Sequence, residues 1–156
     1  MGKKKETTAT TPAPTIAKAV APPPTLTIPL QTTAYIKPVA ERYATAVRCV
    51  FPHFTSLSPL TGSPDNAVIV LDYIPRELLV EVTSLEALIV SFRHMRAFRE
   101  VIVDAISRHI RNAADPIWLR IGAYFQPQGK APVDVFHAFG KLPEYAWIPD
   151  QPTRNW

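Results

Sequence analysis

The sequence contains a single cysteine, Cys49, and only five glycines among its 156 residues. One thiol cannot form an intramolecular disulfide, and it cannot supply a multi-cysteine metal site. No run of eighteen apolar residues occurs, so no segment is predicted to span a bilayer. Lys3, Lys4 and Lys5 are followed by no apolar stretch of the kind that a secretory signal needs. We therefore expect a cytoplasmic protein.

The excess of positive over negative charge is also small. The formal net charge is only +4, and part of that excess lies in the N-terminal lysines. Domains that bind nucleic acid concentrate basic residues more strongly than this. The basic residues of the central region, which are Arg93, Arg96, Arg99, Arg108 and Arg111, are interrupted by Glu100 and Asp104. The four histidines are scattered, with no pair at metal-ligand spacing. The sequence therefore predicts no metal site and no nucleic-acid partner.

Proline is concentrated at the N-terminus, where residues 1–38 hold seven of the seventeen prolines. Such a segment cannot build a core of its own, so we interpret it as an extended arm. It is either a solubilising tail or an arm that lies along a partner, because Pro22–Pro24 favour extended geometry. Residues 144–156 form a second tail that contains Trp147 and Trp156. Exposed aromatic residues near a chain end tend to dock onto a surface, and we expect these two to do so. The globular domain is predicted at residues 39–143.

The pattern inside the domain is typical of an α+β protein. Apolar and β-branched runs predict four strands, at residues 44–51, 67–73, 117–125 and 133–139. Helical periodicity covers residues 84–112, with Ser84 as the expected N-cap, a break near residues 94–97, and a stop at Asp115-Pro116. A long loop is predicted from Pro52 to Asp65.

The motifs FTSLSPLTGSPD (54–65), LDYIP (71–75), LVEVTSLEALIVSFR (79–93) and FRE (98–100) carry a family resemblance. From about Phe51 to Pro143 the chain resembles QueF, a family of nitrile reductases that convert 7-cyano-7-deazaguanine to its aminomethyl form with NADPH. The resemblance implies the tunnelling fold, a ββααββ protomer in which helices pack on one face of an antiparallel sheet. It also implies ring-forming oligomers with binding sites between protomers.

The resemblance places the catalytic positions at Ser58 and Asp65. In the family a cysteine at the first position attacks the nitrile carbon, and here that position is Ser58. A serine hydroxyl needs an adjacent general base, whereas a thiol is activated by a modest fall in its pKa. Asp65 matches the family's proton donor, although an aspartate after proline also caps turns. We therefore expect Ser58 to be inactive.

The family's cofactor signature aligns with residues 81–88. Glu81 and Ser84 are kept, and both remain candidate substrate-binding residues. The two signature lysines, natural partners of NADPH phosphates, are replaced by Thr83 and Glu86. We therefore expect no cofactor, and NADPH only if the chain is a reductase.

The family's His-Glu recognition pair corresponds to Arg99 and Glu100. The Glu100 carboxylate suits the N–H edge of a deazapurine, whereas Arg99 cannot act as an acid or base near neutral pH. The alternative for Glu100 is an ordinary helix-surface ion pair with Arg96, four residues away.

Three interpretations follow. The first is a pseudoenzyme, a non-catalytic protein with a structural or assembly role. It would form homo-oligomers and contact other subunits through residues 1–38 and 144–156, for example in a virion assembled in the cytoplasm. The second is a reductase or amidine-forming enzyme acting on 7-cyano-7-deazaguanine in queuosine- or archaeosine-type base modification. The third is a module that binds a purine-like small molecule through Glu100 without turnover. The loss of the nucleophile and of both lysines favours the first.

Overall fold

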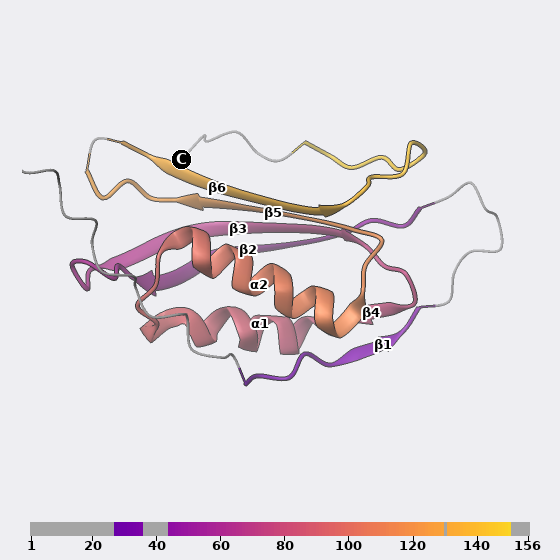
Figure 1. The fold of residues 1–156 in the computed structure, drawn as a ribbon, viewed down its shortest axis with the longest axis horizontal. Coiled ribbons are helices and arrows are strands. Elements are labelled where there is room, and N and C mark those ends of the chain that lie inside the picture. The colour runs from indigo at the N-terminus through magenta and orange to yellow at the C-terminus, as the bar shows by residue number, and fades with distance from the viewer. Residues whose placement is uncertain (1–26, 36–43, 130, 151–156) are drawn as a thin grey trace, which may run out of the picture.

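A four-stranded antiparallel sheet organises the molecule (Figure 1). The computed structural model describes residues 27–35, 44–129 and 131–150. The sheet order is β2-β3-β5-β6, with strands β2 (Val47–Leu57), β3 (Pro64–Ile74), β5 (Trp118–Phe125) and β6 (Val133–Gly140). All four predicted strands are therefore confirmed, in the α+β arrangement that the sequence predicts.

Two helices lie along the sheet, α1 (Val82–Ser91) and α2 (Arg99–Ala114). The predicted break between them is confirmed, because a short 3-10 turn, η1 (Phe92–His94), leads into extended backbone at Met95. Asp115 ends α2 in the left-handed region, at φ 40°, just before Pro116. The predicted N-cap at Ser84 is wrong. Glu81 caps α1 instead, because its carboxylate accepts hydrogen bonds from the amides of Thr83 and Ser84.

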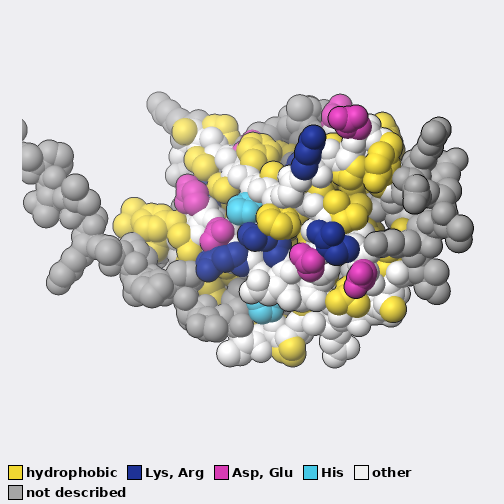
Figure 2. All heavy atoms as spheres, turned by 45° about the vertical axis from the view of Figure 1, so that its right-hand side comes forward, with side chains coloured by type: hydrophobic (Ala, Val, Ile, Leu, Met, Phe, Trp, Pro, Cys, Tyr) yellow, Lys and Arg dark blue, Asp and Glu magenta, His cyan; other side chains and the backbone are white. Residues whose placement is uncertain are grey.

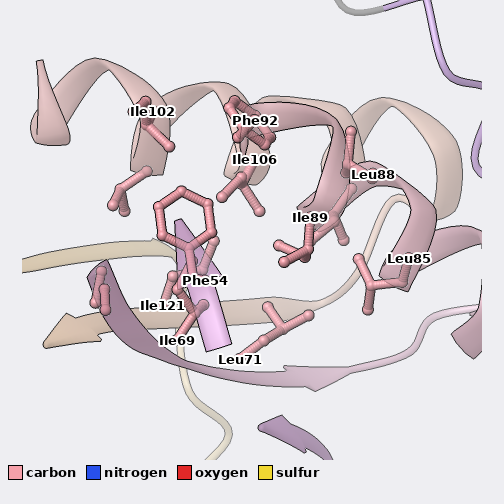
Figure 3. Close-up of a cluster of buried hydrophobic side chains, with 14 of the residues drawn as sticks. Phe54, Ile69, Leu71, Leu85, Leu88, Ile89, Phe92, Ile102, Ile106 and Ile121 are labelled. Carbon is pink, nitrogen blue, oxygen red and sulfur yellow. The ribbon is translucent and has the colours of Figure 1, made fainter. Parts of the chain in front are cut away.

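The hydrophobic core lies between the helices and one face of the sheet (Figure 3). Alternate residues of β3, among them Ile69 and Leu71, point toward the helices. Phe54 fills the centre, with ring centroids 6.1 Å from Phe92 and 6.2 Å from Phe125. Figure 3 shows the helix contributions to this layer, Leu85, Leu88, Ile89, Phe92, Ile102 and Ile106. This packing fixes the position of both helices over the sheet.

The prediction of a long loop from Pro52 to Asp65 is wrong. Strand β2 continues through Leu57, because a bulge between Phe51 and Phe54 absorbs the extra residue and restores pairing with β3. Proline is tolerated there because β2 is an edge strand and Pro52 has no N–H to donate. The actual turn spans only residues 58–63. The candidate site therefore lies at the end of a rigid hairpin.

Part of the predicted N-terminal arm is ordered against the domain. Strand β1 (Thr32–Ala34) pairs antiparallel with β4 (Leu78–Val80). Just before β1, the Ile28 carbonyl lies 2.5 Å from His109 Nε2 on α2. Residues 1–26 and 36–38 of the predicted arm lie outside the described residues, as does Trp156 of the tail.

The C-terminal segment lies on the opposite face of the sheet from the helices. Arg48, Asp72 and Arg120 are cross-strand neighbours on β2, β3 and β5. Asp72 is only 1% exposed and forms ion pairs with both arginines, at 2.5 and 2.8 Å. Both guanidinium groups also donate to the carbonyl of Pro149, at 2.6 and 3.1 Å. This cluster holds the predicted tail against the domain at Pro149, whereas the Trp147 side chain, which was expected to dock, is 79% exposed.

Candidate functional site

Ser58 lies at the turn of the β2-β3 hairpin. Its amide donates to the Ser63 carbonyl, and its own carbonyl accepts from the amide of Gly62, both at 2.9 Å. Gly62 adopts φ 73°, and a Cβ there would lie 2.8 Å from the Arg96 guanidinium. The adjacent Leu57 amide donates to the Met95 carbonyl at 3.0 Å. The turn is therefore fixed against the connection between the helices.

The Ser58 hydroxyl has no general base among the hydrogen-bond partners found in the described part of the chain. Its oxygen accepts a long hydrogen bond, 3.4 Å, from the amide of Thr61. His53, the nearest histidine in sequence, lies in the exposed bulge of β2. A hydroxyl without a base is a poor nucleophile. The geometry therefore shows no activation of Ser58.

Asp65 is bound by Arg99. The aspartate is 3% exposed at the start of β3, and Arg99 lies in the first turn of α2. The arginine donates to Asp65 Oδ1 from Nη2 at 2.5 Å and from Nε at 3.2 Å. The guanidinium carbon also lies 4.9 Å from the centre of the Phe125 ring. Sequence reasoning placed both residues at the site but did not pair them, since 34 residues separate them.

Ser56 is a site residue that sequence reasoning missed. It is the cross-strand partner of Asp65, so both side chains lie on the helix-facing side of the sheet. Ser56 is fully buried, and its hydroxyl has no hydrogen-bond partner among the described residues. Buried hydroxyls are rarely left in this condition. Its place in the FTSL motif was the available signal.

Glu100 is exposed in the first turn of α2, next to Arg99. The alternative role for Glu100 was a surface ion pair with Arg96. The ion pairs of residues 27–35, 44–129 and 131–150 do not include this pair. Arg96 packs against the Gly62 turn instead. The carboxylate is therefore available to a ligand at the same helix end that holds Arg99.

In the stretch that aligns with the family's cofactor signature, Glu81 and Ser84 form hydrogen bonds within the protein. The Glu81 carboxylate accepts from the amides of Thr83 at 2.9 Å and Ser84 at 2.7 Å, and these hydrogen bonds lower the pKa of Glu81. The Ser84 hydroxyl donates to the Glu81 carbonyl and accepts from the backbone of Gln31. Glu81 and Ser84 thus fasten the N-terminal arm to α1.

These contacts do not fit a phosphate-bearing cofactor. A groove of about 450 Å³ runs beside the start of α1, and its described lining is Ile28, Pro29, Gln31, Glu81, Thr83, Ser84 and Ala87. That lining includes no cation. The helix amides that would otherwise bind a phosphate already bind the Glu81 carboxylate. The observed residues therefore do not support NADPH binding at this groove.

Charges of both signs intermix on the face shown in Figure 2, with hydrophobic side chains between them. The described side chains on this face form no continuous basic surface of the kind that binds nucleic acid. In the described part of the chain no helix is long and apolar enough to cross a membrane. No three His, Cys, Asp or Glu residues there are grouped as metal ligands.

Comparison with known proteins identifies the family of this chain. A family model described as QueF-like protein matches residues 64–144. The chain is 49% identical over 104 residues to the NADPH-dependent 7-cyano-7-deazaguanine reductase of Maricaulis maris, covering 67% of this chain and 68% of the relative. This chain belongs to the QueF-like family. A reductase of the same name from Rhizobium etli (strain CIAT 652) is 52% identical over 105 residues, with the same coverage of both chains.

The fold agrees with this assignment. The crystal structure of the archaeosine synthase QueF-Like in the apo form superimposes with a TM-score of 0.58 at 19% identity, covering 63% of this chain and 96% of that one. The resemblance and the tunnelling fold predicted from the sequence are confirmed. The names of the relatives support the enzymatic alternative better than the structural or assembly role. Ring formation, other protein partners, cellular location and incorporation into a particle stay predictions.

Proposed function

We propose that this QueF-like chain binds a 7-deazaguanine base of the kind named in its reductase relatives. The observation that carries the proposal is Glu100, which is exposed, follows Arg99 of the Asp65–Arg99 pair in the sequence, and has no ion pair among the described residues. A carboxylate accepts hydrogen bonds from the N–H edge of a guanine-like ring. The relatives at about half identity supply the ligand class.

The same residues argue against the relatives' reaction. Ser58 has no base among its hydrogen-bond partners in the described structure. Arg99 holds Asp65 in an ion pair and cannot relay a proton near neutral pH. The described residues that line the groove at α1 include no cation for NADPH. The base is therefore bound at this site and not reduced.

NADPH-dependent reduction of 7-cyano-7-deazaguanine is the second candidate function. It is favoured by one specific observation, the shared name of relatives that are 49% and 52% identical to this chain. It requires that nitrile reduction proceed with a serine in place of the thiol.

Two measurements on the purified full chain separate the candidates. For binding alone, 7-cyano-7-deazaguanine raises the melting temperature, Glu100→Ala removes the increase, and NADPH is not consumed. The exposed Glu144 provides the matched control, since Glu144→Ala removes a carboxylate outside the site. Ligand-dependent NADPH oxidation would instead establish the reductase. No melting shift and no oxidation would reject both candidates.

A further inference from the structure

The Asp65–Arg99 pair leaves hydrogen-bonding groups unused on both partners. Both printed contacts from Arg99, through Nε and Nη2, go to Asp65 Oδ1. A guanidinium carries five N–H donors, so Nη1 keeps two and Nη2 one. Among the described residues, neither Nη1 nor Asp65 Oδ2 has a hydrogen-bond partner. Donors and an acceptor therefore lie next to each other.

The pair is still reachable from outside. The Arg99 side chain is 17% exposed and that of Asp65 is 4% exposed. Phe125 contacts the guanidinium through its ring, whose centre lies 4.9 Å from the guanidinium carbon. The low exposure of Asp65 favours a compact polar group as the part of the ligand that contacts both residues.

Ser56 adds an independent observation. Its buried hydroxyl, adjacent to Asp65 across the strands, has no partner in the described structure. An unpaired buried hydroxyl is costly. Three side chains thus carry unused polar atoms at one end of the β2-β3 hairpin, and two of them, Arg99 and Asp65, are partly exposed.

We propose that this cluster recognises a primary carboxamide on the ligand. The ligand is then a 7-deazaguanine that carries a carboxamide where the relatives' named substrate carries a nitrile. The carboxamide oxygen accepts from Arg99 while its NH₂ group donates to Asp65 Oδ2. The inference rests on the proposed function and specifies the substituent that the site prefers.

Other substituents match only half of the cluster. A nitrile offers one acceptor and no donor, so Asp65 Oδ2 stays unpaired. A protonated aminomethyl group suits Asp65 but repels Arg99, and a carboxylate suits Arg99 but repels Asp65. The carboxamide alone among these four groups satisfies both residues.

The test is a calorimetric titration of the full chain with five ligands: unsubstituted 7-deazaguanine and its 7-cyano, 7-carboxamido, 7-aminomethyl and 7-carboxy derivatives. We expect the carboxamide to bind about tenfold more tightly than the nitrile, because it gains a hydrogen bond to a charged group. Equal or weaker binding of the carboxamide overturns the inference while the proposed function stands. Failure of all five ligands to bind overturns both.

A conservative substitution tests whether Asp65 causes the preference for the carboxamide over the nitrile. Asp65→Asn keeps the shape of the side chain but replaces a charged acceptor, so the tenfold preference for the carboxamide over the nitrile should fall to about twofold or less. Asp104→Asn on the exposed side of α2 is the matched control and should keep the full preference. An undiminished preference in Asp65→Asn contradicts the inference. If that variant does not fold, the ligand series on the wild-type chain decides.

Discussion

The guanidinium of Arg99 lies 2.5 Å from the carboxylate of Asp65, which is almost completely buried. The contact joins the first turn of α2 to the first residues of β3. In the resemblance to QueF, these two positions hold a substrate-recognition histidine and a proton donor. Here the two side chains form an ion pair that joins α2 to β3.

Arg99→Leu should lower the free energy of unfolding by about 3 kcal/mol, because it leaves the Asp65 carboxylate buried without its partner. Urea denaturation measures the change. Arg108→Leu is the control, since the Arg108–Asp104 pair is about half exposed on both sides and should cost less than about 1 kcal/mol. Equal effects of the two substitutions would show that the Arg99 pair contributes no more than a surface ion pair.

Phe54→Ala should be among the most destabilising single substitutions, at about 3–5 kcal/mol, because it opens a cavity between Phe92 and Phe125. Thermal or urea unfolding measures the loss. Leu60→Ala, at a position 80% exposed in the hairpin turn, is the control and should change stability by less than about 0.5 kcal/mol. A loss below about 1 kcal/mol for Phe54→Ala would contradict the core described above.

The order of strands and helices could be predicted from the sequence because each element has a strong periodic signal. The hairpin was predicted less well, since Pro52 and His53 resemble a loop while the structure places them in a bulge that keeps Phe54 in the strand. The three-residue strands β1 and β4 are too short for a periodic signal. The N-cap was misplaced because Ser84 fits the usual capping residues better than Glu81 does.

The site could be predicted residue by residue but not as a geometry. The motifs located Ser58, Asp65 and Glu100, yet no local pattern encodes a contact between Asp65 and Arg99, which depends on the packing of α2 over β3. The unpaired hydroxyl of Ser56 is likewise a tertiary property, because it depends on which side chains surround it.

Glu81→Gln should destabilise the protein at neutral pH and have less effect in acid. Hydrogen bonds from Thr83 and Ser84 lower the pKa of Glu81 below its ordinary value of 4.5. The ionised carboxylate therefore stabilises the fold above that value, and the contribution is lost as the pH falls through the lower folded-state pKa. Unfolding curves of both proteins from neutral pH to pH values below 4.5 measure the difference. A difference that stays constant with pH would contradict the capping role.

Asp72→Ala should release the C-terminal segment. Asp72 orients Arg48 and Arg120 and raises the pKa of Arg48, and both arginines bind the carbonyl of Pro149. Amide hydrogen exchange at Tyr145–Ile148 should become faster than in the wild type, relative to unchanged exchange in β5. Asp104→Ala is the control and should leave this exchange unaltered. Unchanged exchange in Asp72→Ala would mean that the segment is held by other contacts.

Ser58→Cys should form a covalent adduct with 7-cyano-7-deazaguanine. The thiolate sulfur adds to the nitrile carbon, the triple bond becomes a C=N double bond, and the nitrogen takes a proton, so the protein gains the full mass of the ligand. The wild-type chain is the control, because burial raises the pKa of its only thiol, Cys49. Intact mass spectrometry reads the result. No adduct would mean that the ligand is not bound next to position 58.

The central claim, that the site binds a 7-deazaguanine base through Glu100, is tested most directly by calorimetric titration of the wild-type chain and Glu100→Ala with 7-cyano-7-deazaguanine. We expect saturable binding to the wild-type chain, weakened at least tenfold in Glu100→Ala because hydrogen bonds to a charged group are lost. Equal binding to both proteins, or no binding to the wild-type chain, would contradict the claim.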